Sequence, residues 1–357
     1  MGLFSKNESY LGVDIGTASI KACELENARG KASLVTYGMA TVPNDLIRNK
    51  SPEVIRQITE AIKVIVEQAG IQTRRVVAAL PGYAVFTFEI ELPKMSTDDL
   101  GSAIKFEAKK YIPVPMDEMV VDWEIIEELV IKGESQKEGN KRKAGSYYRI
   151  LLTAAPRNLV TRYSQIFEDA GLTLDSLETE AMALIRALVG EDKAPILILD
   201  MGATATDICL VDEGFPRLSK GVDIGGNVIT QAIAESLHID TAKAEQYKKD
   251  QGILFDPGKG SVSDAVDSVM KKYITEIQKL MSMFSDKRGR KVEKVILTGG
   301  SARLLGLGEY LEKMLGIKVY AGNPWARVVT PAKVHDSVKR IGPEFSVAIG
   351  LAMRNIY

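Results

Sequence analysis

The chain has 357 residues, 45% of them hydrophobic and 26% charged, so it is too long for one ordinary core and too apolar to be disordered. Its 46 basic and 47 acidic side chains give a net charge of -1, which leaves no electrostatic signature for nucleic acid or an anionic membrane. Two histidines and two cysteines argue against a transition-metal site and a disulfide scaffold. Because no run of about 18 apolar residues occurs, we expect a cytoplasmic protein.

The first 82 residues have the pattern of a mixed α/β domain. Strands are expected at Leu11–Ile15, Ile20–Leu25, Ala32–Ala40 and Arg75–Leu80. Between the last two, Ser51 and Pro52 predict the start of an amphipathic helix that ends at Gly70. This alternation of strands and helix favours an α/β fold.

A different pattern follows Gly82 and predicts an inserted subdomain. It comprises strands at Ala84–Leu92, Met119–Ile131 and Tyr147–Ala154, and helices at Thr97–Tyr111 and Asn158–Ala170. The polar connector Lys132–Ser146 is interpreted as a solvated hairpin tip, which is favoured over a nucleic-acid patch.

The chain then returns to its first pattern. The stretch PILILDMGATATDICLV (Pro195–Val211) repeats the order of YLGVDIGTASIKACEL: an apolar run, Asp, Gly, small hydroxyl-bearing residues and a second strand. Two such units imply two similar domains. We assign 1–82 plus 171–194 to the first, 83–170 to the insertion and 195–357 to the second, with 224–296 as its helical subdomain.

Each repeat supplies a turn suited to polyphosphate, because small residues let the backbone approach phosphate oxygens with its N–H donors. These residues are Gly16, Thr17, Ala18 and Ser19 in the first turn, and Gly202, Ala203 and Thr204 in the second. Lys21 adds a positive charge for the phosphates. Asp14 and Asp200 are candidates to hold Mg²⁺ through its water shell. Either turn alone is equally well explained as a β-hairpin bend, but the pair favours a phosphate clamp.

Two more glycine pairs extend the candidate site. Gly225, Gly226 and Asn227 precede a helix, where an anion or a ribose can approach. Gly299, Gly300 and Ser301 lie between a strand and a helix, where a planar base can lie against bare backbone. Each signal is weak by itself, since Gly-Gly often only makes a tight turn.

In this order and spacing, DIGTASIK, LDMGATATDICL, AEQYK and LTGGSARL resemble the nucleotide motifs of the actin-like ATPase superfamily. Within it, AALPGYAVF, KFEAKKYIPVP and LETEAMALIRAL are similar to the PilM family of type IV pilus assembly, and next to FtsA. The resemblance implies two related domains around a cleft that binds ATP and Mg²⁺, with an FtsA-type inserted subdomain.

The resemblance also implies roles for individual residues. Asp14 and Asp200 would lie on the Mg²⁺ side, and Gly299 to Ser301 would bed the adenine. Glu245 and Lys248 would grip the ribose or base, although without the family a surface ion pair is the better interpretation. Glu178 falls where a water-orienting acid is often found, and the register against Glu180 stays open. Hydrolysis of ATP is left open.

A partner is implied as well: the cytoplasmic N-terminal tail of a PilN-like inner-membrane protein, in a groove between the first domain and the insertion. Other inner-membrane pilus components and self-association are further implied contacts, with recruitment to the cytoplasmic face of the inner membrane. One alternative is an FtsA-like division ATPase; the end of the chain at GLAMRNIY, without an amphipathic membrane helix, favours PilM. The other alternative is an actin-fold sugar kinase, for which no catalytic base is evident.

Overall fold

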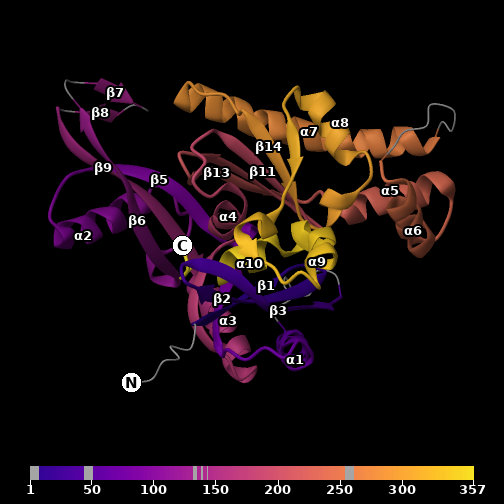
Figure 1. Cartoon of the computed structure of the whole chain (residues 1–357). Coiled ribbons are helices and arrows are strands. Elements are labelled where there is room, and N and C mark those ends of the chain that lie inside the picture. Colours follow the sequence, from indigo (N-terminus) through magenta and orange to yellow (C-terminus); the bar gives the residue numbers. More distant parts are fainter. Residues whose placement is uncertain (1–7, 44–50, 132–134, 138–139, 143, 254–260) are drawn as a thin grey trace, which may run out of the picture. The chain divides into compact units, whose positions relative to one another are not determined.

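The computed structural model describes residues 8–43, 51–131, 135–137, 140–142, 144–253 and 261–357 (Figure 1). The chain forms two compact units. The larger comprises Met1–Gly82 and Gln165–Tyr357, and the smaller comprises Tyr83–Ser164. The larger unit contains two sheets of its own, which carry the two predicted phosphate turns.

The first sheet has six strands in the order β10-β4-β1-β2-β3-β16. Their bounds are Ser9–Ile15 (β1), Ser19–Ala28 (β2), Lys31–Thr41 (β3), Arg75–Leu80 (β4), Thr173–Thr179 (β10) and Val328–Val329 (β16). β1 pairs antiparallel with β2 and parallel with β4. The four strands expected in the first 82 residues are therefore confirmed.

Helix α1 (Pro52–Gln68) begins where the sequence predicts. The Ser51 hydroxyl accepts a hydrogen bond from the Val54 N–H at 3.4 Å, which caps the helix. Its buried residues share one face: Val54, Ile58, Thr59, Ile62 and Ile65. Burial of this apolar stripe, more than intrinsic propensity, stabilises such a helix.

Glu24 in β2 is fully buried, and its carboxylate holds the connection between α1 and β4. It accepts hydrogen bonds from the N–H groups of Gln72 (2.9 Å) and Thr73 (3.2 Å). We expect Glu24→Ala to lower the free energy of unfolding by about 2 kcal/mol, because two N–H groups lose their acceptor. Urea denaturation measures this. Glu24→Gln keeps one acceptor oxygen and should lose less, so equal losses would contradict the role of the carboxylate.

The second sheet has five strands in the order β13-β12-β11-β14-β15. Their bounds are Ile196–Met201 (β11), Thr206–Asp212 (β12), Phe215–Val222 (β13), Lys294–Thr298 (β14) and Val319–Ala321 (β15). β11 and β12 form an antiparallel hairpin, as β1 and β2 do, and β11 runs parallel to β14. The repeat in the sequence is thus a repeat of this hairpin.

Four helices accompany the second sheet: α5 (Gly226–Leu237), α6 (Thr241–Gln251), α7 (Ser261–Arg288) and α8 (Leu307–Leu315). Ile233 of α5, Tyr273 of α7 and Leu311 of α8 are fully buried in one cluster with Leu197 and Leu199 of β11. In Figure 1, α7 and α8 lie over the same face of β11 and β14. This layer fixes the ends of β11 and β14, where two candidate motifs lie.

The end of the chain returns to the first sheet. After α9 (His335–Ile341) and a 3-10 turn at Gly342–Phe345, α10 (Ser346–Ala352) packs on β1 and β2. The approach is close, because a Cβ on Gly12 would lie 2.0 Å from the Ala348 carbonyl oxygen. α10 also packs against α4 (Glu180–Leu184), which continues as a π-helical turn at Ile185–Val189.

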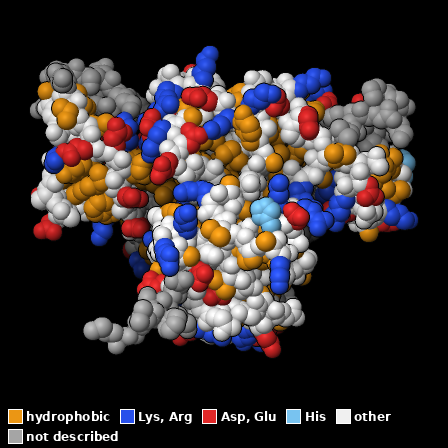
Figure 2. Space-filling model, viewed as in Figure 1, with side chains coloured by type: hydrophobic (Ala, Val, Ile, Leu, Met, Phe, Trp, Pro, Cys, Tyr) orange, Lys and Arg blue, Asp and Glu red, His pale blue; other side chains and the backbone are white. Residues whose placement is uncertain are grey.

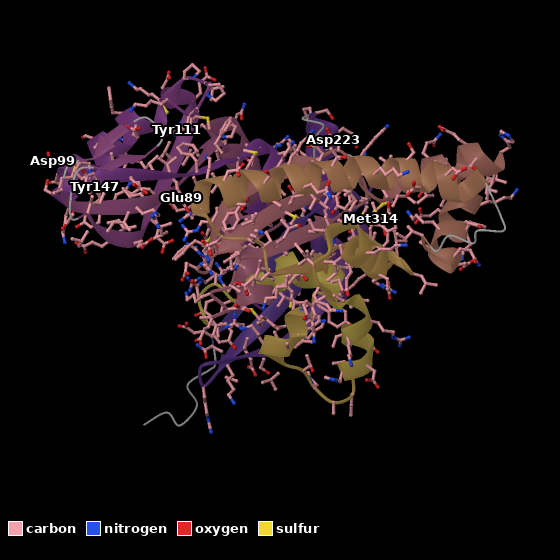
Figure 3. All side chains as sticks on the ribbon, turned by 90° about the horizontal axis from the view of Figure 1, so that it is seen from above. Glu89, Asp99, Tyr111, Tyr147, Asp223 and Met314 are labelled. Carbon is pink, nitrogen blue, oxygen red and sulfur yellow. The ribbon has the colours of Figure 1, made fainter. Side chains whose placement is uncertain are left out.

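The smaller unit has a three-stranded sheet in the order β5-β9-β6, covered by α2. Their bounds are Phe86–Pro93 (β5), Met119–Ile131 (β6), Gly145–Pro156 (β9) and Thr97–Ala108 (α2). Ile104 of α2 and Ile150 of β9 are fully buried in its core. Tyr111, labelled in Figure 3, stacks on Phe88 with ring centroids 4.8 Å apart. The connector contains a short hairpin of β7 (Ser135–Lys137) and β8 (Asn140–Arg142), and its remaining residues up to 143 lie outside the described residues. α3 (Arg157–Asp169) follows.

The described surface agrees with the balance of charges in the composition, and both cysteines are free thiols. On the face seen in Figure 2, basic and acidic side chains are interspersed. Cys23 and Cys209 are both buried, unpaired thiols, and burial raises their pKa, which keeps them unreactive. Among the described helices, none has the length and apolar character needed to cross a membrane.

Candidate functional site

The two predicted phosphate turns close in the same way. In the first, between β1 and β2, the Gly16 N–H donates to the Ser19 carbonyl at 3.0 Å. In the second, between β11 and β12, the Gly202 N–H donates to the Ala205 carbonyl at 2.9 Å. The repeat therefore extends to single hydrogen bonds. Each turn places a short stretch of half-buried small residues at the end of its hairpin.

Asp14 and Asp200 occupy equivalent positions, just before each turn. Asp14 lies opposite Lys21 on β2, and the Lys21 Nζ is 3.4 Å from its carboxylate. Asp200 instead lies opposite Asp207 on β12. One hairpin thus presents an acid beside a base, and the other presents two acids.

The carboxylates form an electrostatically strained cluster. Burial raises the pKa of Asp200 to about 7, with further increases from Asp207 and Asp14 that Lys21 partly opposes. Burial, followed by the charges of Asp207, Asp14 and Asp200, raises the pKa of Glu180 well above its usual range. Several carboxylates close together cannot all ionise cheaply, so a cation would relieve their repulsion.

The sequence predicts that Asp14 and Asp200 contact Mg²⁺ through water rather than directly. Within the described ranges, no three His, Cys, Asp or Glu side chains converge tightly enough to ligate a metal ion directly. Mg²⁺ commonly keeps several waters and uses few carboxylates. The contacts of Asp14 and Asp200 with Mg²⁺ through water stay a prediction.

Asp207 is absent from the site residues that the sequence predicts. Beyond opposing Asp200 in the hairpin, it comes close to the turn after β4, since a Cβ on Gly82 would lie 2.6 Å from its Oδ1. The signal for it was present, because Asp207 follows Asp200 by seven residues, as Lys21 follows Asp14.

Glu178 and Glu180 have different surroundings. Glu178 forms a bidentate ion pair with Arg186, with both N–O distances at 2.8 Å, and lies 3.7 Å from the Arg354 guanidinium. Glu180 accepts a hydrogen bond from the Gly82 N–H at 3.1 Å and lies among the acids. Of the two registers that the sequence left open, the structure brings Glu180 to the cluster.

The N–H groups at the start of α5 bond to the second turn, although the sequence predicts contact with an anion or a ribose. The Gly226 N–H donates to the Gly202 carbonyl at 3.0 Å, and the Asn227 N–H donates to the Ala203 carbonyl at 2.8 Å. Gly225 lies so close that a Cβ there would be 2.6 Å from the Ala203 oxygen. The sequence suggests that these amides contact an anion directly. Instead they hold the second turn, so they are not free for such a contact.

Glu245 and Lys248 form part of a buried network. Lys248 is only 5% exposed, and its Nζ donates to the Gly226 carbonyl (3.0 Å) and the Thr230 hydroxyl (2.8 Å) and pairs with Glu245 (2.6 Å). Burial works against it, but hydrogen bonds from Lys248 and Thr230 hold the pKa of Glu245 below its usual range. Lys248 therefore holds the first turn of α5, and this burial excludes a simple surface ion pair.

The Gly-Gly motif after β14 reaches the same place. Gly299 has φ +85°, and a Cβ there would lie 2.4 Å from the Asp200 Oδ1, so only glycine fits. The next turn, Gly300–Arg303, brings the Ser301 hydroxyl to the Gly202 carbonyl, to which it donates at 3.1 Å. The adenine motif expected from the sequence thus adjoins the second phosphate turn.

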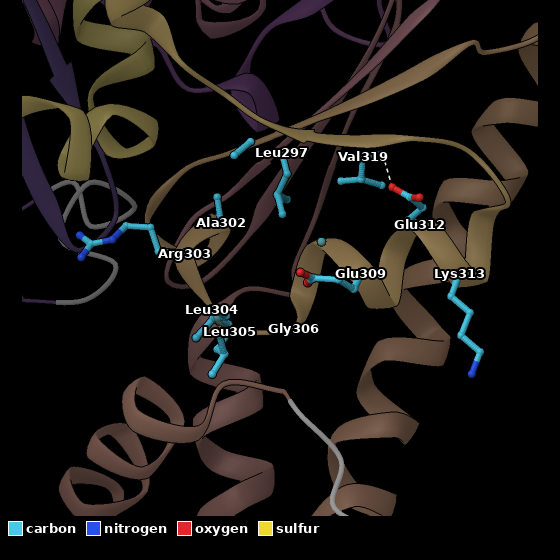
Figure 4. A pocket seen from close by; sticks show the side chains of 12 residues that line it. Leu297, Ala302, Arg303, Leu304, Leu305, Gly306, Glu309, Glu312, Lys313 and Val319 are labelled. Atoms are coloured by element: carbon cyan, nitrogen blue, oxygen red, sulfur yellow. Dashed lines mark hydrogen bonds between the residues drawn. The ribbon is translucent and has the colours of Figure 1, made fainter.

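A pocket of about 590 Å³ adjoins the segment that follows this motif (Figure 4). It is bordered by the 302–306 segment, α8 and β15, with Leu297 and Val319 among its apolar lining residues. Glu312 at its rim accepts a hydrogen bond from the Val319 N–H at 3.2 Å. None of the two turns' residues lines it, so it is separate from the candidate phosphate site.

The residues present fit a nucleotide phosphate group. The Thr204 hydroxyl in the second turn is buried and has no hydrogen-bond partner among the described atoms. The two turns also lack bulky side chains that would keep an anion from the backbone. A buried, orphaned hydroxyl in a small-residue turn is the kind of group that a phosphate oxygen satisfies.

Comparisons with solved structures identify the fold. The chain is similar to a PilM-PilN type IV pilus biogenesis complex with a TM-score of 0.81 and 26% identity, covering 99% of this chain and 100% of that one. It also resembles MreB5 of Spiroplasma citri bound to ADP, with a TM-score of 0.50 and 14% identity, covering 96% and 94%. The fold is that of the actin-like ATPases.

Curated relatives and a family profile complete the comparison. The cell division protein FtsA of Neisseria meningitidis is 23% identical, covering 97% of this chain and 90% of that protein. FtsA of Bacillus subtilis is 22% identical over 70% of this chain, which spans 59% of that protein's length. The profile described as type IV pilus assembly protein PilM matches residues 12–356. The chain therefore belongs to the PilM family of type IV pilus assembly proteins.

Proposed function

We propose that this chain binds ATP with Mg²⁺ and acts as a nucleotide-loaded adaptor in type IV pilus assembly. The observation that carries the nucleotide site is the meeting of two identically closed turns, an acidic cluster and the Gly-Gly motif. Phosphates would bind the small-residue turns and Lys21, and Mg²⁺ would lie by Asp14 and Asp200 through water. The adenine would lie against Gly299 and Gly300, with the ribose near Glu245.

Calorimetry with ATP and Mg²⁺ tests this site directly. Asp200→Ala should weaken binding of Mg²⁺-ATP about tenfold or more while changing the affinity for metal-free ADP little, because the acid acts through the metal. Equal losses for the two ligands would give Asp200 a structural role instead. No heat of binding from the unmodified protein would refute the nucleotide site itself.

Glu180 is the residue we propose for orienting the water that attacks the terminal phosphate. Whatever the turnover rate of the unmodified protein, Glu180→Gln should lower it about 100-fold, because an amide cannot accept the water's proton. Its affinity for Mg²⁺-ATP should change little. Glu178→Gln is the matched control: it breaks the pair with Arg186 and should lower stability rather than turnover. The reverse pattern would return the role to Glu178.

For a partner, we propose the cytoplasmic N-terminal tail of a PilN-like inner-membrane protein. The support is the family match over residues 12–356 and the similarity to a PilM-PilN complex at 26% identity. The protein would then work in the cytoplasm and reach the inner membrane through this partner. Titration of such a peptide into the nucleotide-loaded protein tests the proposal, with a scrambled peptide as control. Equal affinity for both peptides would refute it.

A further inference from the structure

We infer that Ser301 is a positioning residue that orients the backbone of the second phosphate turn, a role distinct from bedding the adenine. This inference rests on the proposed nucleotide site. It starts from two contacts: the Ser301 hydroxyl and the Gly226 N–H both donate to the Gly202 carbonyl, at 3.1 and 3.0 Å.

Because the peptide unit is planar, holding the Gly202 carbonyl also fixes the direction of the Ala203 N–H. The Gly202 C=O and the Ala203 N–H belong to one planar trans peptide unit, so they point in opposite directions. Since the carbonyl is directed to Ser301 and α5, the Ala203 N–H is directed away from them. Within the described part of the chain, that N–H donates to no backbone carbonyl.

The next peptide unit is held in the same sense. The Ala203 carbonyl accepts from the Asn227 N–H at 2.8 Å, so the Thr204 N–H also points away from α5. Two successive N–H groups on one side of a turn form a concave anion-binding nest. The orphaned Thr204 hydroxyl belongs to the same turn. The second turn is therefore shaped as an anion nest before any ligand binds.

Ser301 contributes something that Gly226 alone does not. A single donor leaves the Gly202 peptide plane able to rock about that bond, whereas two donors from separate segments fix it. The Gly226 side is itself held, because the Lys248 Nζ donates to the Gly226 carbonyl at 3.0 Å. Ser301 is 8% exposed and packs where a Cβ on Gly226 would lie 2.7 Å from its hydroxyl.

The contact of Ser301 with Gly202 would link the adenine part of the bound nucleotide to its phosphates. Ser301 follows Gly299 and Gly300, so a base seated on those glycines would steady the serine that aims the phosphate donors. Because an interaction with preorganised donors needs no rearrangement on binding, loss of the Ser301 hydroxyl should be felt at the phosphates.

The test compares three ligands on the full chain. Ser301→Ala should weaken Mg²⁺-ATP about fivefold to tenfold by calorimetry, the range expected for one lost hydrogen bond. Tripolyphosphate with Mg²⁺, measured by displacement of ATP, should weaken by a similar factor, and adenosine by less than twofold. Ser301→Thr, which keeps the hydroxyl, should restore the affinity for Mg²⁺-ATP.

Ser346→Ala is the matched control. It removes a buried serine hydroxyl that lies 2.7 Å from the Thr298 hydroxyl and is not bonded to the turn, so it should leave all three affinities within twofold. If the unmodified protein binds no ATP, the proposed function fails. If it does bind, an unchanged Ser301→Ala affinity, a loss shared equally by adenosine, or a folded Ser301→Thr variant as weak as Ser301→Ala overturns the inference alone.

Discussion

Mg²⁺-ATP is expected to raise the melting temperature of the unmodified protein and to leave that of a Gly202→Val variant unchanged. At a hundredfold excess over its dissociation constant, a ligand stabilises the folded state by about 2.7 kcal/mol. A valine side chain at the start of the second turn would occupy the space that a phosphate needs and would press on the Ala205 carbonyl, since even a Cβ there lies 3.1 Å from it. An affinity loss of more than 100-fold removes nearly all of the stabilisation.

The control for this prediction is Gly308→Val in α8, where an added Cβ meets nothing within 4 Å. Mg²⁺-ATP should raise the melting temperature of Gly308→Val by as much as it raises that of the unmodified protein. The comparison is made with and without nucleotide for all three proteins, so that a general loss of stability is separated from a loss of binding. If Gly202→Val kept its full ATP-dependent shift, the second turn would not contact the phosphates.

Asp200→Asn should stabilise the protein above pH 7 when Mg²⁺ and nucleotide are removed. The folded state raises the pKa of this acid from an ordinary value of 3.8 to about 7, so between these values it binds more protons than the unfolded state does. The protonated acid contributes its full stability below pH 3.8. This contribution to the free energy of unfolding decreases as the pH rises from 3.8 and is lost above 7. Since each tenfold change in proton affinity is worth about 1.4 kcal/mol, the ionised acid costs on the order of 4 kcal/mol.

Urea denaturation in EDTA from pH 5 to 8.5 measures this effect. The gain from Asp200→Asn should grow with pH and level off above 7. Asp192→Asn is a control of opposite sign, because hydrogen bonds from Lys294 and the Ala194 N–H lower the pKa of Asp192. That variant should lose stability at neutral pH, and its deficit should shrink as the pH falls. A gain from Asp200→Asn that did not depend on pH would show that charge is not its cause.

The candidate phosphate turns were predictable because their signal is local. Gly16 and Gly202 follow buried strands with an acid two residues earlier, and such spacing fixes which residues meet at the end of a hairpin. The strands and α1 followed from periodicity and capping for the same reason.

What the sequence did not provide depends on contacts between distant segments. The amides of Gly226 and Asn227 bond to a turn more than twenty residues earlier, so their spacing alone favoured an exposed helix start. Glu180 lies in the acidic cluster, whereas Glu178 forms an ion pair with Arg186. Neither choice is written in a short motif, since each depends on which side chains the fold brings together.

The packing of α10 on β1 and β2 also bears on how the protein forms during synthesis. β1 and β2 are synthesised long before Ala348, Ile349 and Met353, which bury Cys23 and Leu25. Domains usually fold as units while the chain is being made. Here the apolar face of β1 and β2 that α10 covers stays uncovered until α10 has been synthesised. A premature stop within α10 would therefore destabilise the β1–β2 hairpin, although the two are far apart in the sequence.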